Sequence, residues 1–211
     1  MAQRLRFSAA AAYRSLRAAD PVIGELIDRH GPYKPRPSGD PYASLVRVIM
    51  HQQLAGPAAR AIMGRMLALF GDDGHTPTPK AILAMPDSTF REAGVSRQKT
   101  SYLKDLAAHV ADGALDFDAL DPLSDDDVIH RLTAVHGIGE WTAHMFLMFQ
   151  LGRPNILPVG DLGVCKGMKI AYGLRSMPTP KRAKKIGAAW SPYASVASWY
   201  MWRVADTVTP D

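Results

Sequence analysis

The stretch DDVIHRLTAVHGIGEWTAHMFLMFQ, residues 126–150, contains two helix-forming segments separated by the short turn Gly137-Ile138-Gly139. The turn is too short to fold as an independent loop, so the flanking segments are expected to form a helical hairpin. Glycine adopts backbone conformations that are closed to other residues, and it lets the backbone approach another molecule closely. The hairpin amides, with the N–H groups that open the helix at Glu140, can therefore bind an anion such as a single phosphate. Ile138 is the apolar side chain expected to fix the turn onto its own helices.

An ordinary helical hairpin, whose glycines only permit the turn, remains the alternative for this motif. The motif is not a dinucleotide-binding fingerprint, because a helix rather than a strand precedes it and no third glycine follows.

The rest of the chain also reads as helix. Helix-capping residues stand before most apolar periodic segments, often with proline in the first helical position. These start signals are Asp40-Pro41, Pro57, Thr78-Pro79, Asp87, Ser96, Ser124, Thr179-Pro180 and Ser191-Pro192. Strand signals are poor, because no run alternates apolar and polar residues between turn residues. The sequence predicts an all-α fold of about ten short helices.

Composition excludes several classes of protein. The chain has 211 residues, of which 47% are hydrophobic and 21% charged, a globular balance rather than a disordered one. No apolar run is long enough to cross a membrane, and the first residues lack the apolar core of a signal peptide. Cys165 is the single cysteine, which excludes an internal disulfide, a four-cysteine zinc site and a ligated iron–sulfur cluster. A cytoplasmic location is expected.

The charge is unevenly distributed. The formal net charge is +5, yet residues 112–127 contain seven aspartates and no lysine or arginine. Residues 166–185 contain seven lysines and arginines and no acid. A phosphate backbone would require such a basic stretch, although a solvated helix face explains it equally well when it is considered alone.

Several motifs occur in an order that resembles a known family. LTAVHGIGEWTAHMFLMFQ, followed by NILPVGDLGVCKG, resembles the helix-hairpin-helix and catalytic-aspartate signature of the DNA glycosylase superfamily. GIGEWTA, IMHQQLAGPAA, GVSRQKTSYLKDLA and WSPYASVASWYMWR resemble its 3-methyladenine DNA glycosylase II (AlkA-like) branch. The resemblance runs from Asp40 to Arg203 and implies a single glycosylase domain, residues 1–211. It implies two helical subdomains, 40–150 and 1–39 with 151–211, with the active-site cleft between them.

Asp161 in LPVGDLGVCKG lies where a helix should begin, so the residue pattern alone predicts a helix cap. The resemblance makes it the catalytic carboxylate, and the two roles are compatible. Cleavage of a purine N-glycosidic bond develops positive charge on the sugar, which a carboxylate stabilises. Relatives that also cut the DNA backbone carry lysine where this chain has Trp141, and tryptophan cannot form a Schiff base. A monofunctional, hydrolytic enzyme is therefore expected.

The resemblance also implies a pocket for the extruded base, formed by Trp141, Met145 and Trp190. Stacking on an indole favours an electron-poor, cationic methylated purine. Met145 departs from the tyrosine frequent in relatives, which leaves the selectivity of the pocket open. Trp199 and Trp202 are expected to pack in the core.

Other residues are expected to bind DNA. Gln53 is the candidate wedge that fills the gap left by the extruded nucleotide, with Leu54 as the alternative. Gly137, Ile138 and Gly139 form the hairpin grip, and Lys166 is expected to contact a phosphate.

The resemblance implies a monomer that acts on double-stranded DNA containing 3-methyladenine, 7-methylguanine and related lesions, in the cytoplasm and associated with the nucleoid. No catalytic cofactor or metal is implied, although hairpin carbonyls hold a structural monovalent cation in this family. Two alternatives remain: a non-catalytic helix-hairpin-helix DNA-binding protein, and a glycosylase for oxidised or deaminated bases.

Overall fold

The computed structural model of the protein describes residues 6–35, 39–71 and 74–207. Within these ranges the chain forms twelve α-helices and two short 3-10 helices, and no strand. The all-α expectation is confirmed, with two helices more than the sequence predicts. In the same ranges, no helix combines the length and apolar character that a membrane span requires.

The chain divides into two compact units. One consists of residues 38–143, and the other joins residues 1–37 to residues 144–211. The boundary between residues 143 and 144 falls inside α9 (Glu140–Phe149). The sequence predicts this boundary after residue 150, beyond the end of the helix. The proline-rich sequence GPYKPRPSGDP, residues 31–41, predicts either a linker or a tight corner, and its residues 36–38 lie outside the described residues.

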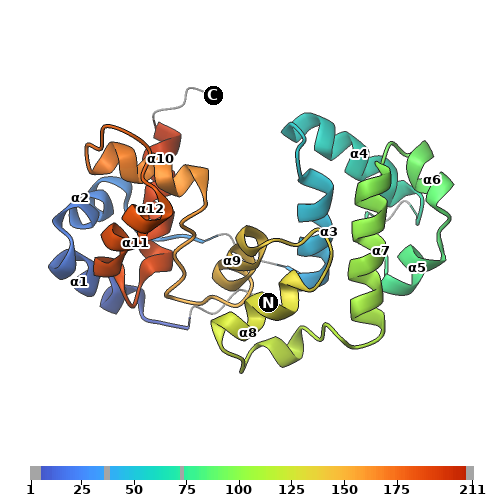
Figure 1. Ribbon diagram of the computed structural model, residues 1–211, viewed down its shortest axis with the longest axis horizontal. Coiled ribbons are helices and arrows are strands. Elements are labelled where there is room, and N and C mark those ends of the chain that lie inside the picture. The colour runs from blue at the N-terminus through green and yellow to red at the C-terminus, as the bar shows by residue number, and fades with distance from the viewer. Residues whose placement is uncertain (1–5, 36–38, 72–73, 208–211) are drawn as a thin grey trace. The chain divides into compact units, whose positions relative to one another are not determined.

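The unit of residues 38–143 is arranged around α7 (Arg97–Ala111), which packs against α3, α5 and α6 (Figure 1). Its other elements are α3 (Pro41–His51), α4 (Gly56–Ala68), α5 (Pro79–Ala84), α6 (Asp87–Glu92), η1 (Asp118–Leu120), α8 (Asp125–Thr133) and the start of α9. Helix α7 buries Leu103 and Leu106 completely, and Phe90 of α6 is equally buried. The hairpin after α8 is held to α7 by the His136 N–H, which donates to Asp105 at 2.7 Å.

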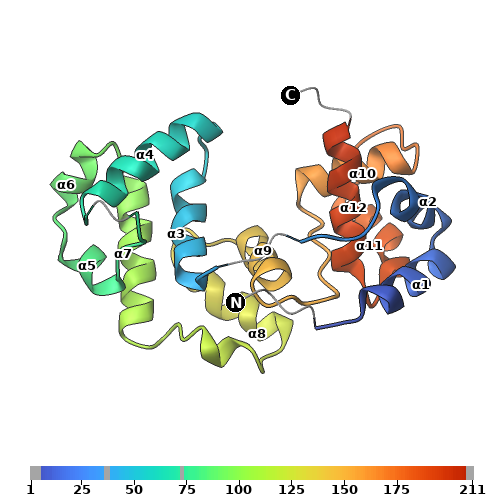
Figure 2. The ribbon, with the colours of Figure 1, turned by 180° about the vertical axis from the view of Figure 1, so that it is seen from behind.

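The other unit contains the two ends of the chain, and its longest helix is α12 (Ala194–Thr207). The remaining elements are α1 (Ala9–Ala19), α2 (Pro21–His30), α10 (Leu162–Ala171), α11 (Pro180–Gly187) and η2 (Ala188–Trp190). Figure 2 shows α1 and α2 beside α10, α11 and α12, although they come from opposite ends of the sequence. Their shared core includes Leu16, Ile23, Met168 and Tyr200.

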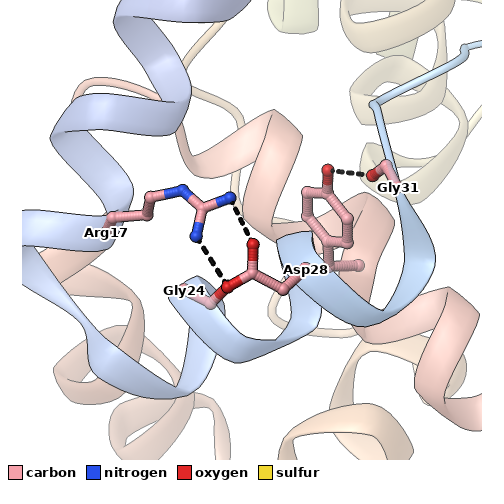
Figure 3. Close-up of polar contacts among 5 residues, drawn as sticks. Arg17, Gly24, Asp28 and Gly31 are labelled. Atoms are coloured by element: carbon pink, nitrogen blue, oxygen red, sulfur yellow. Dashed lines mark hydrogen bonds and ion pairs between the residues drawn. The ribbon is translucent and has the colours of Figure 1, made fainter.

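Polar contacts also join α2 to its neighbours in this unit. Arg17 of α1 donates two hydrogen bonds to Asp28, at 2.8 and 2.7 Å, and one to the Gly24 carbonyl, at 3.3 Å (Figure 3). The bonds from Arg17 lower the pKa of the Asp28 carboxyl. Tyr200 of α12 donates to the Gly31 carbonyl, at 2.8 Å, at the end of α2.

Most of the predicted helix caps are confirmed. Five capping side chains accept a backbone N–H in the first turn of their helices: Asp40, Thr78, Ser96, Ser124 and Thr179. Two predictions were wrong. Asp87 is the first residue of α6 rather than its cap. Ser191 lies in a turn in which the Tyr193 N–H donates to the Trp190 carbonyl at 2.7 Å, and α12 begins only at Ala194.

Two glycines of α10 allow it to approach α12 closely. A Cβ atom on Gly167 would lie 2.1 Å from the backbone oxygen of Met201, and one on Gly163 would lie 2.7 Å from Cδ1 of Trp202. Neither distance is compatible with a side chain, because packed interiors transmit such an overlap to the backbone. The spacing of four residues places both glycines on the same face of α10.

We expect Gly167→Ala to destabilise the protein by at least about 2 kcal/mol, because the new methyl group would overlap the α12 backbone. Urea unfolding followed by circular dichroism measures the change. Gly160→Ala is the matched control, since a Cβ there meets nothing within 4 Å and should leave the midpoint unchanged. Equal midpoints for the two variants would contradict the close packing of α10 on α12.

Candidate functional site

Asp161 caps α10 and is held from two sides. Its Oδ1 atom accepts the backbone N–H of Val164, at 2.7 Å, and the indole N–H of Trp202, at 2.8 Å. The residue is 7% exposed. The predicted cap is therefore present, and its carboxylate lies in an environment where nearby charge interacts more strongly than in bulk water.

The loop before Asp161 is fixed to α12 by one buried serine. Ser195 Oγ donates to the Arg153 carbonyl, at 2.7 Å, and accepts the Ile156 N–H, at 2.9 Å. The Ser195 backbone N–H donates to the Pro154 carbonyl, at 3.0 Å. Buried polar groups with full hydrogen bonding are rigid, so the approach of the chain to Asp161 is fixed before α10 begins.

The tryptophan beside Asp161 is Trp202, for which the sequence predicts only a role in core packing. The sequence predicts Trp202 in the core, but its half-buried indole bonds the carboxylate and lies 5.8 Å, between ring centroids, from Phe149. Gly163 and Gly167 are the sequence signal that could have indicated this contact between α10 and α12. Small residues four apart on one helix face indicate a large partner on the neighbouring helix.

The expectation that Trp190 lines a base pocket needs correction. Trp190 is 0% exposed, and its indole N–H donates to Asp20 Oδ2, at 3.0 Å, and to the Tyr172 hydroxyl, at 3.1 Å. Tyr172 also donates to the same carboxylate. A ring that is enclosed in this way has no face for a base, so Trp190 joins η2 to the start of α2 instead.

Cys165 lies one turn after Asp161, and it is a buried thiol. Its Sγ donates to the Val159 carbonyl at 3.3 Å. Burial, together with the nearby charge of Asp161, raises the pKa of the Cys165 thiol. The thiolate is the nucleophilic form, so the raised pKa disfavours covalent chemistry at Cys165, whose thiol bonds the loop before Asp161.

The hairpin between α8 and α9 is fixed from within its own unit. Gly137 has φ +90°, and a Cβ on it would lie 2.3 Å from the ring of Tyr102. Its carbonyl accepts the side-chain amide of Gln52 at 2.9 Å. The His136 N–H donates to Asp105 at 2.7 Å, and Ile138 is 4% exposed, as its predicted anchoring role requires.

Gly139 is different from Gly137. Its φ is not positive, and a Cβ on it would meet no atom within 4 Å. Neither backbone conformation nor internal packing explains a glycine there. The Gly139 carbonyl accepts the Ala143 N–H at 3.1 Å, so the residue opens α9, where free backbone N–H groups can bind an anion.

The turn between α3 and α4 carries the two wedge candidates. Gln53 has φ +56°, and within the described ranges it is the one residue other than glycine with a positive φ. Backbone strain of this kind is found at sites where a ligand is engaged. Gln53 is exposed, and Leu54 is 37% exposed.

A cavity of about 250 Å³ lies under this turn. Its lining residues come from the turn after α3, from α7 and from the hairpin: Gln52, Gln53, Gln98, Lys99, Tyr102 and Gly137. The Lys99 amine donates to the Met50 carbonyl at 2.5 Å, and partial burial lowers its pKa. The wedge turn and the hairpin are thus parts of one hydrogen-bonded surface in this unit.

The surroundings of the wedge turn are basic. Burial, with the positive charges of Arg47, Lys99 and Arg60, lowers the pKa of His51 at the end of α3. A group of cations around the turn favours the approach of a polyanion.

Three further expected site residues lie on α9 and α10. Trp141 is 48% exposed, whereas Met145 and Lys166 are half-buried. Asp161, Met145 and Lys166 belong to one compact unit, and Trp141, Gln53 and the hairpin belong to the other.

Metal ligation has little support in the described ranges, where no three His, Cys, Asp or Glu side chains are grouped to hold an ion. The hairpin carbonyls of Val135 and Gly137 each accept one hydrogen bond and keep a second lone pair. These two oxygens are the donors that the hairpin offers to the structural monovalent cation that the resemblance implies.

Comparison with known families decides the class of the protein. The family of HhH-GPD superfamily base excision DNA repair proteins matches residues 46–192, which include both the hairpin and Asp161. The chain belongs to this superfamily.

Individual HhH-GPD superfamily proteins are similar to this chain over most of its length. It is 31% identical to the DNA-3-methyladenine glycosylase 1 of Schizosaccharomyces pombe, over 86% of this chain and 79% of that protein. The crystal structure of a DNA-3-methyladenine glycosidase from Bacillus halodurans has a TM-score of 0.85 and 38% identity, covering 93% of this chain and 89% of that one.

A second structure of the superfamily contains DNA. The 3-methyladenine DNA glycosylase of Schizosaccharomyces pombe in complex with abasic DNA has a TM-score of 0.81 and 32% identity. The similarity covers 92% of this chain and 95% of that one.

The contrast between the two hairpin glycines is testable by stability alone. We expect Gly137→Ala to lower the free energy of unfolding of the protein by at least about 1 kcal/mol, because the residue needs a positive φ and the new methyl group would overlap Tyr102. Gly139→Ala should be neutral or slightly stabilising. Thermal unfolding of both variants measures the difference, and a destabilised Gly139→Ala would show that internal packing explains both glycines.

Proposed function

We propose that this protein is a monofunctional DNA glycosylase that releases alkylated purines and leaves an abasic site for base excision repair. Superfamily membership and the activity for which its relatives are named support the class of reaction. The observation that carries the proposal is Asp161, a buried carboxylate that caps α10 and is bonded by an indole N–H. We further propose that the protein acts as a monomer on chromosomal DNA in the cytoplasm.

The proposed reaction begins with extrusion of the damaged nucleotide from the duplex. Extrusion costs a few kcal/mol, and a wedge must replace the lost base stacking. Gln53 is the proposed wedge and Leu54 the alternative, because both lie exposed on the turn after α3. The hairpin, through the amide of Gly139 and the opening turn of α9, is the proposed grip on a phosphate. Lys166 is a proposed second phosphate contact.

Asp161 is the proposed catalytic residue. As the bond between sugar and base lengthens, positive charge develops on the sugar, and an ionised carboxylate stabilises it. The same group can orient or deprotonate the water that attacks the sugar. The two hydrogen bonds to Oδ1 fix the orientation of the carboxylate before substrate arrives, so little reorganisation is needed during the reaction.

Trp141 is the proposed stacking surface for the released base. Its ring is 48% exposed, and an alkylated purine carries a positive charge that an indole face attracts. Because tryptophan has no amine, the residue cannot form the Schiff base of a lyase, and the proposed product is an intact strand with an abasic site. Met145 is proposed to shape the same pocket and so to influence which lesions are released.

We expect Asp161→Asn to slow the release of 3-methyladenine and 7-methylguanine from methylated duplex DNA by at least about 100-fold. Asparagine caps a helix as well as aspartate does, so α10 should remain intact. Chromatography of the freed bases, with EDTA present, measures release, and anisotropy measures duplex binding, which should be retained.

Asp126→Asn is the matched control, since that carboxylate is exposed on α8. Undiminished release by Asp161→Asn would contradict the assignment of the catalytic residue. Duplex binding without release of any alkylated base by the wild-type protein would favour a DNA-binding module, and release of only oxidised or deaminated bases would favour the other alternative. Strand cleavage without alkali would contradict a monofunctional enzyme.

Trp141→Ala should slow release of 7-methylguanine by about 2- to 30-fold, the loss expected when a cation–π contact of about 0.5–2 kcal/mol is removed. Trp141→Phe should recover part of the rate, because a smaller aromatic face remains. Single-turnover rates measured for both variants provide the comparison. If the two variants were slowed equally, stacking on the ring would not be the role of Trp141.

A further inference from the structure

Helix α11 carries a strongly basic surface outside the proposed site. Four of its eight residues are cations, all of them exposed, and we define them as the α11 basic face: Lys181, Arg182, Lys184 and Lys185. At 100° per residue they occupy an arc of about 160°, so they form one continuous face. The opposite side is buried through Ala183 and Gly187, where a Cβ would lie 2.5 Å from the Leu157 side chain.

The charge of this face is not neutralised within the part of the chain that the structure describes. None of its four cations forms an ion pair there, in contrast to the pairs Arg17–Asp28, Lys104–Asp87 and Arg203–Asp206. The sequence explains why, since residues 166–185 contain no acid. Exposed Arg175 precedes the helix and adds a fifth cation to the same segment.

The arrangement opposes the stability of the helix itself. Lys181 and Lys185 are four residues apart, and like charges at that spacing destabilise a helix. Lys181 and Arg182 also lie in the first turn, where the helix dipole disfavours positive charge. A helix face that only contacts solvent would be more stable with mixed charges. An anionic partner, in contrast, would offset both the like-charge repulsion and the unfavourable interaction with the helix dipole.

We propose that the α11 basic face binds the phosphate backbone of duplex DNA, as a contact separate from the hairpin. The proposal deepens the proposed function, which supplies the DNA. A phosphate backbone fits the face better than an acidic protein does, because lysine is depleted at protein–protein interfaces, whereas lysine and arginine provide phosphate contacts.

The proposed contact is with backbone phosphates, so it adds affinity for DNA of any sequence. Helix α11 belongs to the same compact unit as Asp161, and it leads through η2 into α12, which carries Trp202.

The experiment compares two double variants that remove equal charge. Lys184→Gln/Lys185→Gln changes the α11 basic face, and Lys80→Gln/Arg91→Gln removes two exposed cations from α5 and α6. Anisotropy measures binding of each protein to an undamaged duplex over a series of KCl concentrations. Each lost phosphate contact should reduce the slope of log K against log[salt] by about 0.9.

For the α11 variant we expect a slope reduced by about 1 to 2, with affinity lowered several-fold, while the control pair retains the wild-type slope. Lys184→Arg/Lys185→Arg should also retain it, because the charge is kept. Glutamine has a helix propensity close to that of lysine, so the melting temperature should not fall.

Equal slopes for the α11 variant and the control pair would overturn the proposal. So would a variant that loses affinity for poly-glutamate but not for duplex DNA, because the face would then fit an acidic protein. Base release by the wild-type protein is measured in parallel. If the wild-type protein released no base but the α11 variant still had a reduced slope of log K against log[salt], the proposed function would be overturned and this inference would stand.

Discussion

The close approach of α10 to α12 is the constraint on which the proposed chemistry depends. Gly163 and Gly167 let the two helices approach until only hydrogen atoms fit between them. That proximity brings the Trp202 indole N–H within 2.8 Å of Asp161 Oδ1. A longer side chain at either glycine would separate the helices, and the carboxylate would lose the bond that orients it. Helix packing thus decides the geometry of the proposed catalytic carboxylate.

The same unit uses its buried polar groups to fix the segments that surround this carboxylate. Ser195 holds the loop before Asp161 with three hydrogen bonds, and Asp20 holds Tyr172 and Trp190 at the other end of α10. Ser195, Asp20 and Trp190 are buried, Tyr172 is half-buried, and all four are paired, so none carries the desolvation penalty of an unmatched polar atom. The result is a rigid frame, in which the N-terminus of α10 has one position.

The hairpin in the other unit is the proposed grip on a DNA phosphate, and its turn is held by contacts within that unit. Tyr102 packs against Gly137, and Gln52 bonds its carbonyl, so the turn is fixed from inside. Gly139 then opens α9, with no side chain between its backbone and an approaching molecule. A rigid turn with one uncovered glycine can bind an anion through backbone dipoles without a charged side chain, which is the basis of the proposed phosphate grip.

The sequence by itself determined the helical class, most helix starts and the candidate carboxylate, because capping side chains and proline act within one turn of the chain. Asp40, Ser96, Ser124 and Thr179 are examples of such local signals. The superfamily, too, is evident from the ordered motifs alone. Only the tertiary structure decided between the tryptophans: it buried Trp190 against Asp20 and placed Trp202 beside Asp161. Both tryptophans lie in similar apolar segments, and their roles depend on contacts between residues 170 and 41 positions apart. No local pattern encodes such distances, since they arise from how the helices pack.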